Sequence, residues 1–304
     1  MKNIRLLLSI TAFFTLLSYL ANAQGCSDAG FCTINSFKPN NSSNLIETKN
    51  QFKVGVSFGK ADYSILVFGS YVEYNRQLNN NFSIDAKVTS VAQNGNNVSS
   101  FGLSDIYLNA NYKISEKVKF AFGAKIPLAD GNKIKDNLSL PMDYQSSLGT
   151  VDLILGLGYD LNKIQLVAAL QQPLTQNNNG FMSEKYPSSS KLSSFQSTNK
   201  FKRSGDFLLR VSYPITLNNK LKLTPSLLPI YHLANDKYTD ALGSEKEITG
   251  SQGLTFNGNV YFDYEMNTNS AIQLNLGVPF VVRTKKPDGL TRSFVINVEY
   301  RVKF

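Results

Sequence analysis

Few side chains in this sequence combine the types and spacing that catalysis needs. The single histidine, His232, has Ser226 six residues away on the same expected strand, which is too far for the hydrogen bond of a serine–histidine pair. Cys26 and Cys32 lie far from His232, so no metal-ligand spacing occurs, and no glycine-rich phosphate-binding loop is present. We therefore expect no enzyme, no metal and no cofactor.

The two cysteines, Cys26 and Cys32, are close enough in the sequence to form one local disulfide bond. In an exported protein, an even pair at this spacing favours the bond, and two free thiols are the alternative.

A second group of candidate residues carries charge within segments that alternate between apolar and polar side chains. Asp152 falls on the polar phase of its segment, and Asp105 directly precedes the apolar phase that starts at Ile106. Two carboxylates in a narrow interior need cationic partners, because unpaired buried charge is costly. We predict that six residues face the interior: Asp105, Lys113, Lys119, Lys125, Asp152 and Arg210. They either fill the interior structurally or line and gate a path through it.

The segments that carry these residues have the period of two that is typical of strands with two different faces. In the last segment, Phe294, Ile296, Val298, Tyr300, Val302 and Phe304 alternate with polar residues. We predict twelve strands, at 52–59, 63–77, 81–92, 101–115, 117–127, 148–161, 163–173, 203–217, 220–234, 251–266, 270–282 and 291–304. Several are longer than the strands of a soluble sandwich or propeller, which is the alternative fold.

The connections alternate between short and long. Tight turns that contain Asn, Asp or Ser occur at 78–81, 115–117, 160–163, 217–220 and 266–269. They alternate with mostly longer segments at 93–100, 128–147, 174–202, 235–250 and 283–290, given a short first outer hairpin at 60–62. Outer-membrane barrels have short periplasmic turns and long outer loops. The pattern therefore predicts an all-β fold, a transmembrane antiparallel up-and-down β-barrel of about twelve strands over residues 51–304.

The N-terminal residues indicate export. A basic start, an apolar run from Leu6 to Leu20 and the small-residue site ending at Ala23 predict a signal peptide over residues 1–23. A membrane anchor and a lipoprotein acylated at Cys26 are weaker alternatives. Residues 24–50 are too polar for a lipid-facing strand, so we expect a short periplasmic segment that is either a plug in the barrel mouth or a flexible tail.

Composition fits a barrel in the outer membrane of a Gram-negative bacterium. The chain has a net charge of +9 without a nucleic-acid-binding motif, which favours contact with anionic lipopolysaccharide over nucleic acid. It has 15 Tyr, 20 Phe and no Trp, so Tyr and Phe must form the interfacial girdles next to membrane lipid. The alternating last strand that ends in Phe304 resembles the signal read by the outer-membrane assembly machinery.

Residues 101–161 also resemble a known family. The motifs are Phe101-Gly102-Leu103-Ser104-Asp105-Ile106-Tyr107-Leu108, Gly123-Ala124-Lys125-Ile126-Pro127-Leu128, Leu140-Pro141, Gln145, Gly149-Thr150-Val151-Asp152, Gly156 and Tyr159. Together they resemble outer-membrane proteins of the MetA pathway of phenol degradation, a family related in shape to long-chain fatty-acid channels. The sequence departs from the pattern at Ala129-Asp130 and at Thr150. The resemblance implies passage of small hydrophobic or aromatic compounds.

Three functions are compatible with these observations. The first is a passive channel for a small hydrophobic solute, because nothing in the sequence indicates an energy source. The second is a non-transporting structural or surface-interaction barrel that acts through its outer loops, of which 174–202 is rich in Asn, Ser and Lys. The third, a hydrolase that uses His232, has the least support.

Overall fold

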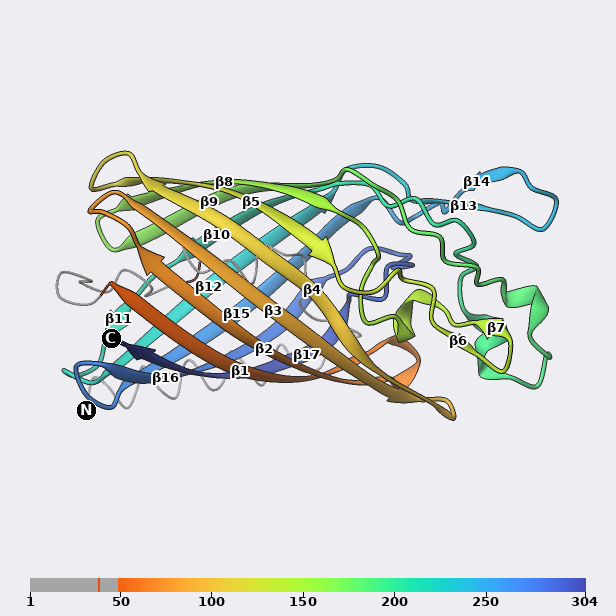
Figure 1. Ribbon diagram of the computed structural model, residues 1–304, viewed down its shortest axis with the longest axis horizontal. Coiled ribbons are helices and arrows are strands. Elements are labelled where there is room, and N and C mark those ends of the chain that lie inside the picture. The colour runs from red at the N-terminus through yellow and green to blue at the C-terminus, as the bar shows by residue number, and fades with distance from the viewer. Residues whose placement is uncertain (1–37, 39–48) are drawn as a thin grey trace.

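The computed structural model describes Lys38 and residues 49–304, and these residues form a closed antiparallel barrel of twelve strands (Figure 1). The strands are β1 (Asn50–Ala61), β2 (Leu66–Gln77), β3 (Phe82–Gly95), β4 (Val98–Lys113), β5 (Val118–Pro127), β8 (Asp152–Leu161), β9 (Ile164–Pro173), β10 (Asp206–Ser212) continued by β11 (Ile215–Thr216), β12 (Leu221–His232), β15 (Gly253–Glu265), β16 (Ser270–Val281) and β17 (Arg292–Lys303). Consecutive strands pair with one another around the barrel.

Two features close the sheet. β1 pairs with β17 along nearly its whole length, from Gln51 opposite Lys303 to Ala61 opposite Arg292. β10 pairs with β12, and the strand is interrupted before β11 at Pro214, which has no N–H to donate to the neighbouring strand. Because both ends of the sheet are paired, no barrel strand leaves an open edge.

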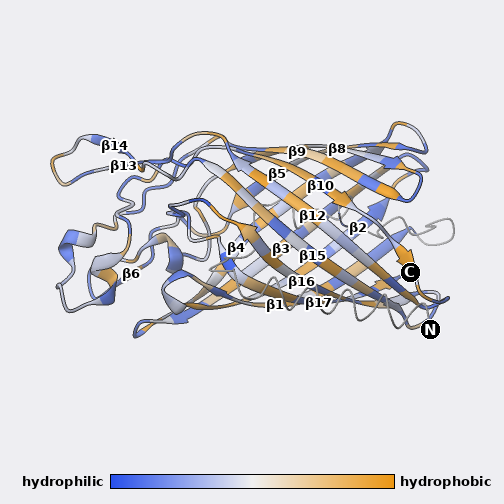
Figure 2. Ribbon diagram, turned by 180° about the vertical axis from the view of Figure 1, so that it is seen from behind, coloured by the Kyte–Doolittle hydropathy of each residue, from blue (hydrophilic) through white to orange (hydrophobic). Residues whose placement is uncertain are grey.

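The two faces of the barrel differ sharply in polarity. Large apolar side chains are exposed on the outside: Val56, Phe68, Val72, Val88, Leu108, Phe122, Leu157, Leu209, Leu227, Leu276 and Val298. Figure 2 shows hydrophobic (orange) segments along the strands of the barrel. Charged side chains are buried inside: Lys53, Glu73, Asp85, Lys87, Lys125, Asp152, Arg210, Asp263, Glu299 and Arg301. This arrangement is the inverse of a water-soluble core, and it is stable only where hydrocarbon surrounds the strands.

Tyrosines collect at the end of the barrel that carries the short turns. Tyr74, Tyr112, Tyr159, Tyr264 and Tyr300 each lie one to three residues from a strand end there, and all are exposed outward. Rings with a polar tip favour the membrane–water interface. In the absence of Trp, these tyrosines supply the periplasmic girdle.

At the opposite end, four long connections form what we call the outer cap, residues 128–151, 174–205, 233–252 and 282–291 (Figure 1). The outer cap contains two short hairpins, β6 (Ile134–Lys135) with β7 (Leu138–Ser139) and β13 (Lys237–Thr239) with β14 (Glu245–Glu247), and the 3-10 turns η4 (Met142–Tyr144), η5 (Ser183–Lys185) and η6 (Lys191–Ser194). A fourth turn, η3 (Asp62–Ser64), joins β1 to β2.

The outer cap has an apolar core of its own. Tyr144, Phe181 and Phe195 are buried there, and they form one cluster with Ile65 and Val98 of the barrel rim. The rings of Tyr63 and Phe195 stack with their centroids 3.9 Å apart. Aromatic packing of this kind fixes the cap on the barrel mouth.

The predicted fold and the alternation of short and long connections are confirmed, with one exception. We expected a long outer loop at 93–100, but β3 and β4 continue to a two-residue turn at Asn96-Asn97. Both residues have positive φ, 51° and 60°, which is the conformation that a tight hairpin turn requires and that Asn tolerates.

No helix among the described residues is long and apolar enough to cross a membrane. The predicted signal peptide at 1–23 and the predicted disulfide between Cys26 and Cys32 lie outside the described residues.

Candidate functional site

The barrel interior contains a cavity of about 130 Å³ beneath the outer cap. Small and polar side chains from β1, β2 and β3 form one wall, and Met142, Leu148 and Leu290 of the outer cap form its roof. Six charged residues line it: Lys38, Lys87, Asp105, Lys125, Asp288 and Arg292. The cavity is the candidate site, because it lies inside the barrel on the line between the two membrane faces.

A β-bulge places Asp105 in this cavity. Pairing between β3 and β4 shifts so that Thr89 alone lies opposite both Ser104 and Asp105, and both of these side chains are buried. The Asp105 carboxylate accepts hydrogen bonds from the Ser104 hydroxyl at 2.8 Å and the Ser147 hydroxyl at 2.7 Å. The bulge is visible in the sequence as a change of apolar phase between Leu103 and Ile106, a signal that our strand assignment did not use.

Lys125 and Asp152 form a buried ion pair across β5 and β8. Lys125 Nζ lies 2.9 Å from Asp152 Oδ2 and donates to the Thr150 hydroxyl at 3.0 Å. Thr150 and Gln171 both donate to the Asp152 carboxylate. With these bonds the carboxylate is fully engaged, as a buried charge requires.

Deeper in the barrel, Glu299 of β17 is the centre of a second charged network. Lys38 donates to Glu299 Oε2 at 2.6 Å, and the Tyr71 hydroxyl donates to the same atom. Lys53 lies 3.3 Å from Glu73 and 3.8 Å from Glu299. The position of Lys38 shows that this residue of the N-terminal segment reaches the barrel interior.

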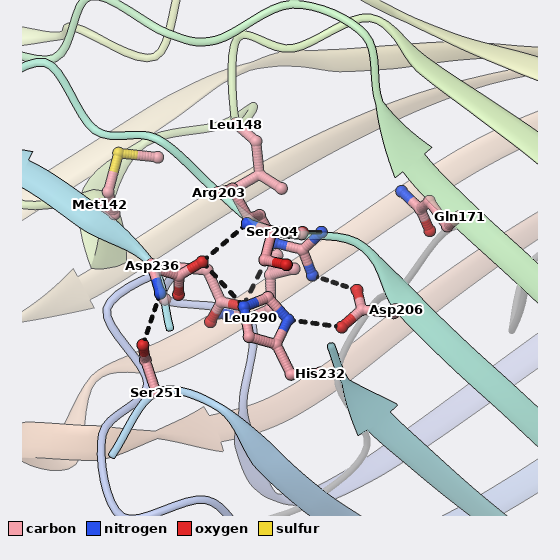
Figure 3. Close-up of polar contacts among 12 residues, drawn as sticks. Met142, Leu148, Gln171, Arg203, Ser204, Asp206, His232, Asp236, Ser251 and Leu290 are labelled. Atoms are coloured by element: carbon pink, nitrogen blue, oxygen red, sulfur yellow. Dashed lines mark hydrogen bonds and ion pairs between the residues drawn. The ribbon is translucent and has the colours of Figure 1, made fainter. Parts of the chain in front are cut away.

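A third network joins strand ends to the outer cap (Figure 3). The imidazole of His232 lies between two carboxylates, with Nδ1 2.7 Å from Asp206 and Nε2 2.8 Å from Asp236. Arg203 binds Asp206 on one side and Asp288 on the other. Burial alone would raise the pKa of Asp288, but the nearby guanidinium groups of Arg283 and Arg203 outweigh burial and hold that pKa below its usual range.

Asp143, a partly buried residue of the outer cap, has a raised pKa, in contrast to the lowered pKa of Asp288. Burial, and then the negative charge of Asp62, raise the pKa of Asp143 to about 7.

The Asp143 backbone packs against Gly289, where a Cβ would lie 2.7 Å from Asp143 Cα. Gly289 has φ +64°, so its lack of a side chain allows both the backbone conformation and this close approach.

The six residues predicted to face the interior lie in three places. Asp105 and Lys125 line the cavity. Asp152 and Arg210 are buried inside the barrel but do not line it. Lys113 and Lys119 lie at the periplasmic ends of their strands, where they pair with Glu116 at 2.7 Å and with Asp160 at 3.0 Å.

Sequence reasoning missed several residues of the site. Lys87 and Glu73 follow the polar phase of their strands, so the alternation could have identified them. The cavity residues Asp288 and Arg292 lie at the end of an outer loop and just beyond it, and no period marks such positions. The two carboxylate partners of His232 come from different elements, and only the fold brings them to it.

A closed barrel with an apolar exterior and a charged interior is the form in which strands cross a bacterial outer membrane. The chain is an outer-membrane β-barrel. No family model and no curated protein matches it.

Several solved structures are similar in fold. The translocator domain of the autotransporter NalP from Neisseria meningitidis is 9% identical, with a TM-score of 0.49 over 90% of this chain and 94% of that one. The CymD monoaromatic hydrocarbon channel is 8% identical, with a TM-score of 0.45 over 84% and 89%. The toluene transporter TbuX of Ralstonia pickettii is 10% identical, with a TM-score of 0.42 over 89% and 93%. At these values the likeness extends to barrel architecture alone.

Proposed function

We propose that this chain is a passive channel for small hydrophobic or aromatic compounds. The observation that carries the proposal is the cavity of about 130 Å³ inside the barrel. Around the interior, one side-chain amide atom of each of six buried or half-buried asparagines has no hydrogen-bond partner among the described residues: Asn109, Asn111, Asn257, Asn259, Asn275 and Asn297. Buried polar atoms of this kind are usually satisfied by ordered water, which supports a hydrated interior.

The motif residues that resemble the MetA-pathway family support this assignment. Asp105, Lys125 and Gln145 all line the cavity, although they are up to forty residues apart in the sequence. Gly149 has φ +67°, and a Cβ there would lie 2.2 Å from the Asp130 carbonyl oxygen, so this glycine is needed for the turn that brings Thr150 and Asp152 into place. The motifs thus build the cavity wall, which is where a shared substrate class would act.

The outer cap offers an entry surface for such compounds. It exposes the apolar side chains of Leu128, Ile134, Leu174 and Leu242. Exposed apolar side chains at a barrel mouth concentrate apolar solutes from water by the hydrophobic effect. Movement from there to the periplasm follows the concentration gradient, because the sequence has no phosphate-binding loop.

The N-terminal segment at 24–50 is proposed to act as a plug. Lys38 is buried in the interior and bonded to Glu299, while residue 50 lies at the periplasmic end of β1. Residues 1–23 are proposed as the cleaved signal peptide.

We propose two binding partners from side chains exposed at the two ends of the barrel. Phe304 is exposed next to β17 at the periplasmic end, where assembly machinery would read it. The outer cap exposes Lys185, Lys191 and Lys200, which suit contact with anionic lipopolysaccharide.

The test is conductance together with uptake. The purified mature protein in planar bilayers should give discrete conductance steps, and a strain that lacks the chain should take up aromatic compounds more slowly, with restoration by the gene. No conductance and unchanged uptake would favour a non-transporting barrel that acts through its outer loops.

A further inference from the structure

Two of the six charged residues that line the cavity differ from the other four. Lys38 binds Glu299, Lys125 binds Asp152, and Asp288 binds Arg283, with separations of 2.6 to 2.9 Å. Asp105 accepts two serine hydroxyl bonds. Each of these four charges has short hydrogen bonds to protein groups.

Lys87 has no such bond among the described residues. Its Nζ lies 3.9 Å from Glu73 Oε2, beyond hydrogen-bond range, and 3.6 Å from the centre of the Tyr71 ring. Only 3% of Lys87 is exposed. An ammonium group has three donors, so this buried cation has capacity for an acceptor that the surrounding described residues do not supply.

Arg292 is the second charged residue of the cavity that lacks a short bond to an oppositely charged group among the described residues. Its Nη1 donates to the carbonyl oxygens of Gly289 and Thr291, at 2.6 and 3.1 Å. Within the described part of the chain, no carboxylate lies within ion-pair distance of its guanidinium group, and its hydrogen bonds are the two from Nη1. Arg292 interacts electrostatically with Asp143, but no carboxylate bonds to its guanidinium group, and a carboxylate ligand would satisfy its paired donors.

The space between these two cations is open because the wall there carries small side chains. Ser57, Gly69, Ser70 and Ser90 line the same cavity on β1, β2 and β3. Arg292 lies at the outer start of β17, whereas Lys87 lies deeper along β3, so a solute entering from outside meets Arg292 first. The apolar side chains of Val91, Val295 and Leu290 face the same space.

We propose that the cavity binds small organic acids that combine one carboxylate with a compact apolar body, with Arg292 and Lys87 as successive carboxylate partners. This inference rests on the proposed channel function and narrows its cargo from hydrophobic or aromatic compounds in general to their monocarboxylates. Apolar lining contacts the body, and the two cations select for the charge.

The experiment compares three probes with the same ring and different charge: potassium benzoate, benzyl alcohol and benzylammonium chloride. Calorimetric titration of the full mature chain in detergent micelles should show benzoate binding at least about tenfold tighter than the other two. In planar bilayers under a potassium benzoate gradient, the reversal potential should have the sign of benzoate selectivity.

Variants separate the two cations from general effects. Lys87→Met and Arg292→Gln should each weaken benzoate binding about tenfold and reduce benzoate selectivity, whereas Lys87→Arg should retain both. Lys222→Gln, at the half-exposed pair of Lys222 with Glu265, is the matched control and should behave like the parent. If Lys87→Met does not fold, Lys87→Arg and Arg292→Gln still test the site.

The outcomes distinguish this inference from the proposed function. A conducting channel in which benzoate shows no advantage over benzyl alcohol would overturn the carboxylate site and leave the channel standing. Absence of conductance would overturn the channel, while titration with benzoate would still support or overturn the binding site. Unchanged benzoate binding in the folded Lys87→Met and Arg292→Gln variants would also overturn the proposed carboxylate site.

Discussion

The imidazole Nδ1 of His232 lies 2.7 Å from the carboxylate of Asp206 on the neighbouring strand, and the two residues are directly paired in the β10–β12 register. The other ring nitrogen faces Asp236 of the outer cap at 2.8 Å. Only a protonated ring can donate from both nitrogens. His232 therefore links the barrel wall to the outer cap through both ring nitrogens, and in its protonated form it donates to both carboxylates.

Replacing this histidine should destabilise the protein strongly. His232→Leu leaves two buried carboxylates without their shared partner, and breaking a buried ionic contact of this kind costs about 3 kcal/mol. Guanidinium unfolding in micelles measures the difference from the parent. Lys237→Ala is the control, because its pair with Glu245 is exposed and contributes less than about 1 kcal/mol. Equal effects of the two substitutions would contradict the role of His232.

The Lys125–Asp152 pair should show strong coupling in a double-mutant cycle. Lys125→Met leaves the Asp152 carboxylate buried with only Thr150 and Gln171 as donors, so we expect a loss of about 3 kcal/mol. Lys125→Met combined with Asp152→Leu removes both charges and should recover most of that loss. Additive losses from the two single substitutions would show that the ion pair has no special role.

The outer cap should be less stable at alkaline pH because of Asp143. Its pKa is raised to about 7 in the folded protein, above the value of about 4 in an unfolded chain. The folded state therefore holds this proton more tightly, so the stabilisation is complete below about pH 4 and is lost as the pH rises through about 7. Thermal unfolding should occur at a lower temperature at pH 8 than at pH 5. Asp143→Asn cannot titrate, and its pH dependence in this range should be smaller than that of the parent.

The apolar belt makes a prediction about charge on the outer wall. Val298 is exposed midway along β17, so Val298→Arg places a cation in hydrocarbon and should cost about 2–4 kcal/mol. Reversible folding into lipid vesicles measures this cost. Leu242→Arg changes a residue that is 91% exposed at the tip of the β13–β14 hairpin, outside the barrel wall, and should have no measurable effect. A similar cost for both would mean that lipid does not cover β17.

The sequence alone determined the barrel and most strand boundaries. Each strand meets lipid on one side and a polar interior on the other, so a period of two appears directly in the residue order, as it does from Phe294 to Phe304. The turn at Asn96-Asn97 was missed because long strands continue through polar residues, and polarity alone does not distinguish a strand end from a loop.

Only the tertiary structure decided which charges meet. Alternation indicated that Asp105 and Lys125 face inward, but Asp105 binds two serines, whereas Lys125 pairs with Asp152. The cavity roof and the contacts of His232 and Arg292 depend on the outer cap, whose irregular backbone has no period. Strand periodicity is a local property, so the residue order alone reveals it. The partners of a side chain inside a closed barrel depend on strand register and loop packing, and these are set only when the barrel closes.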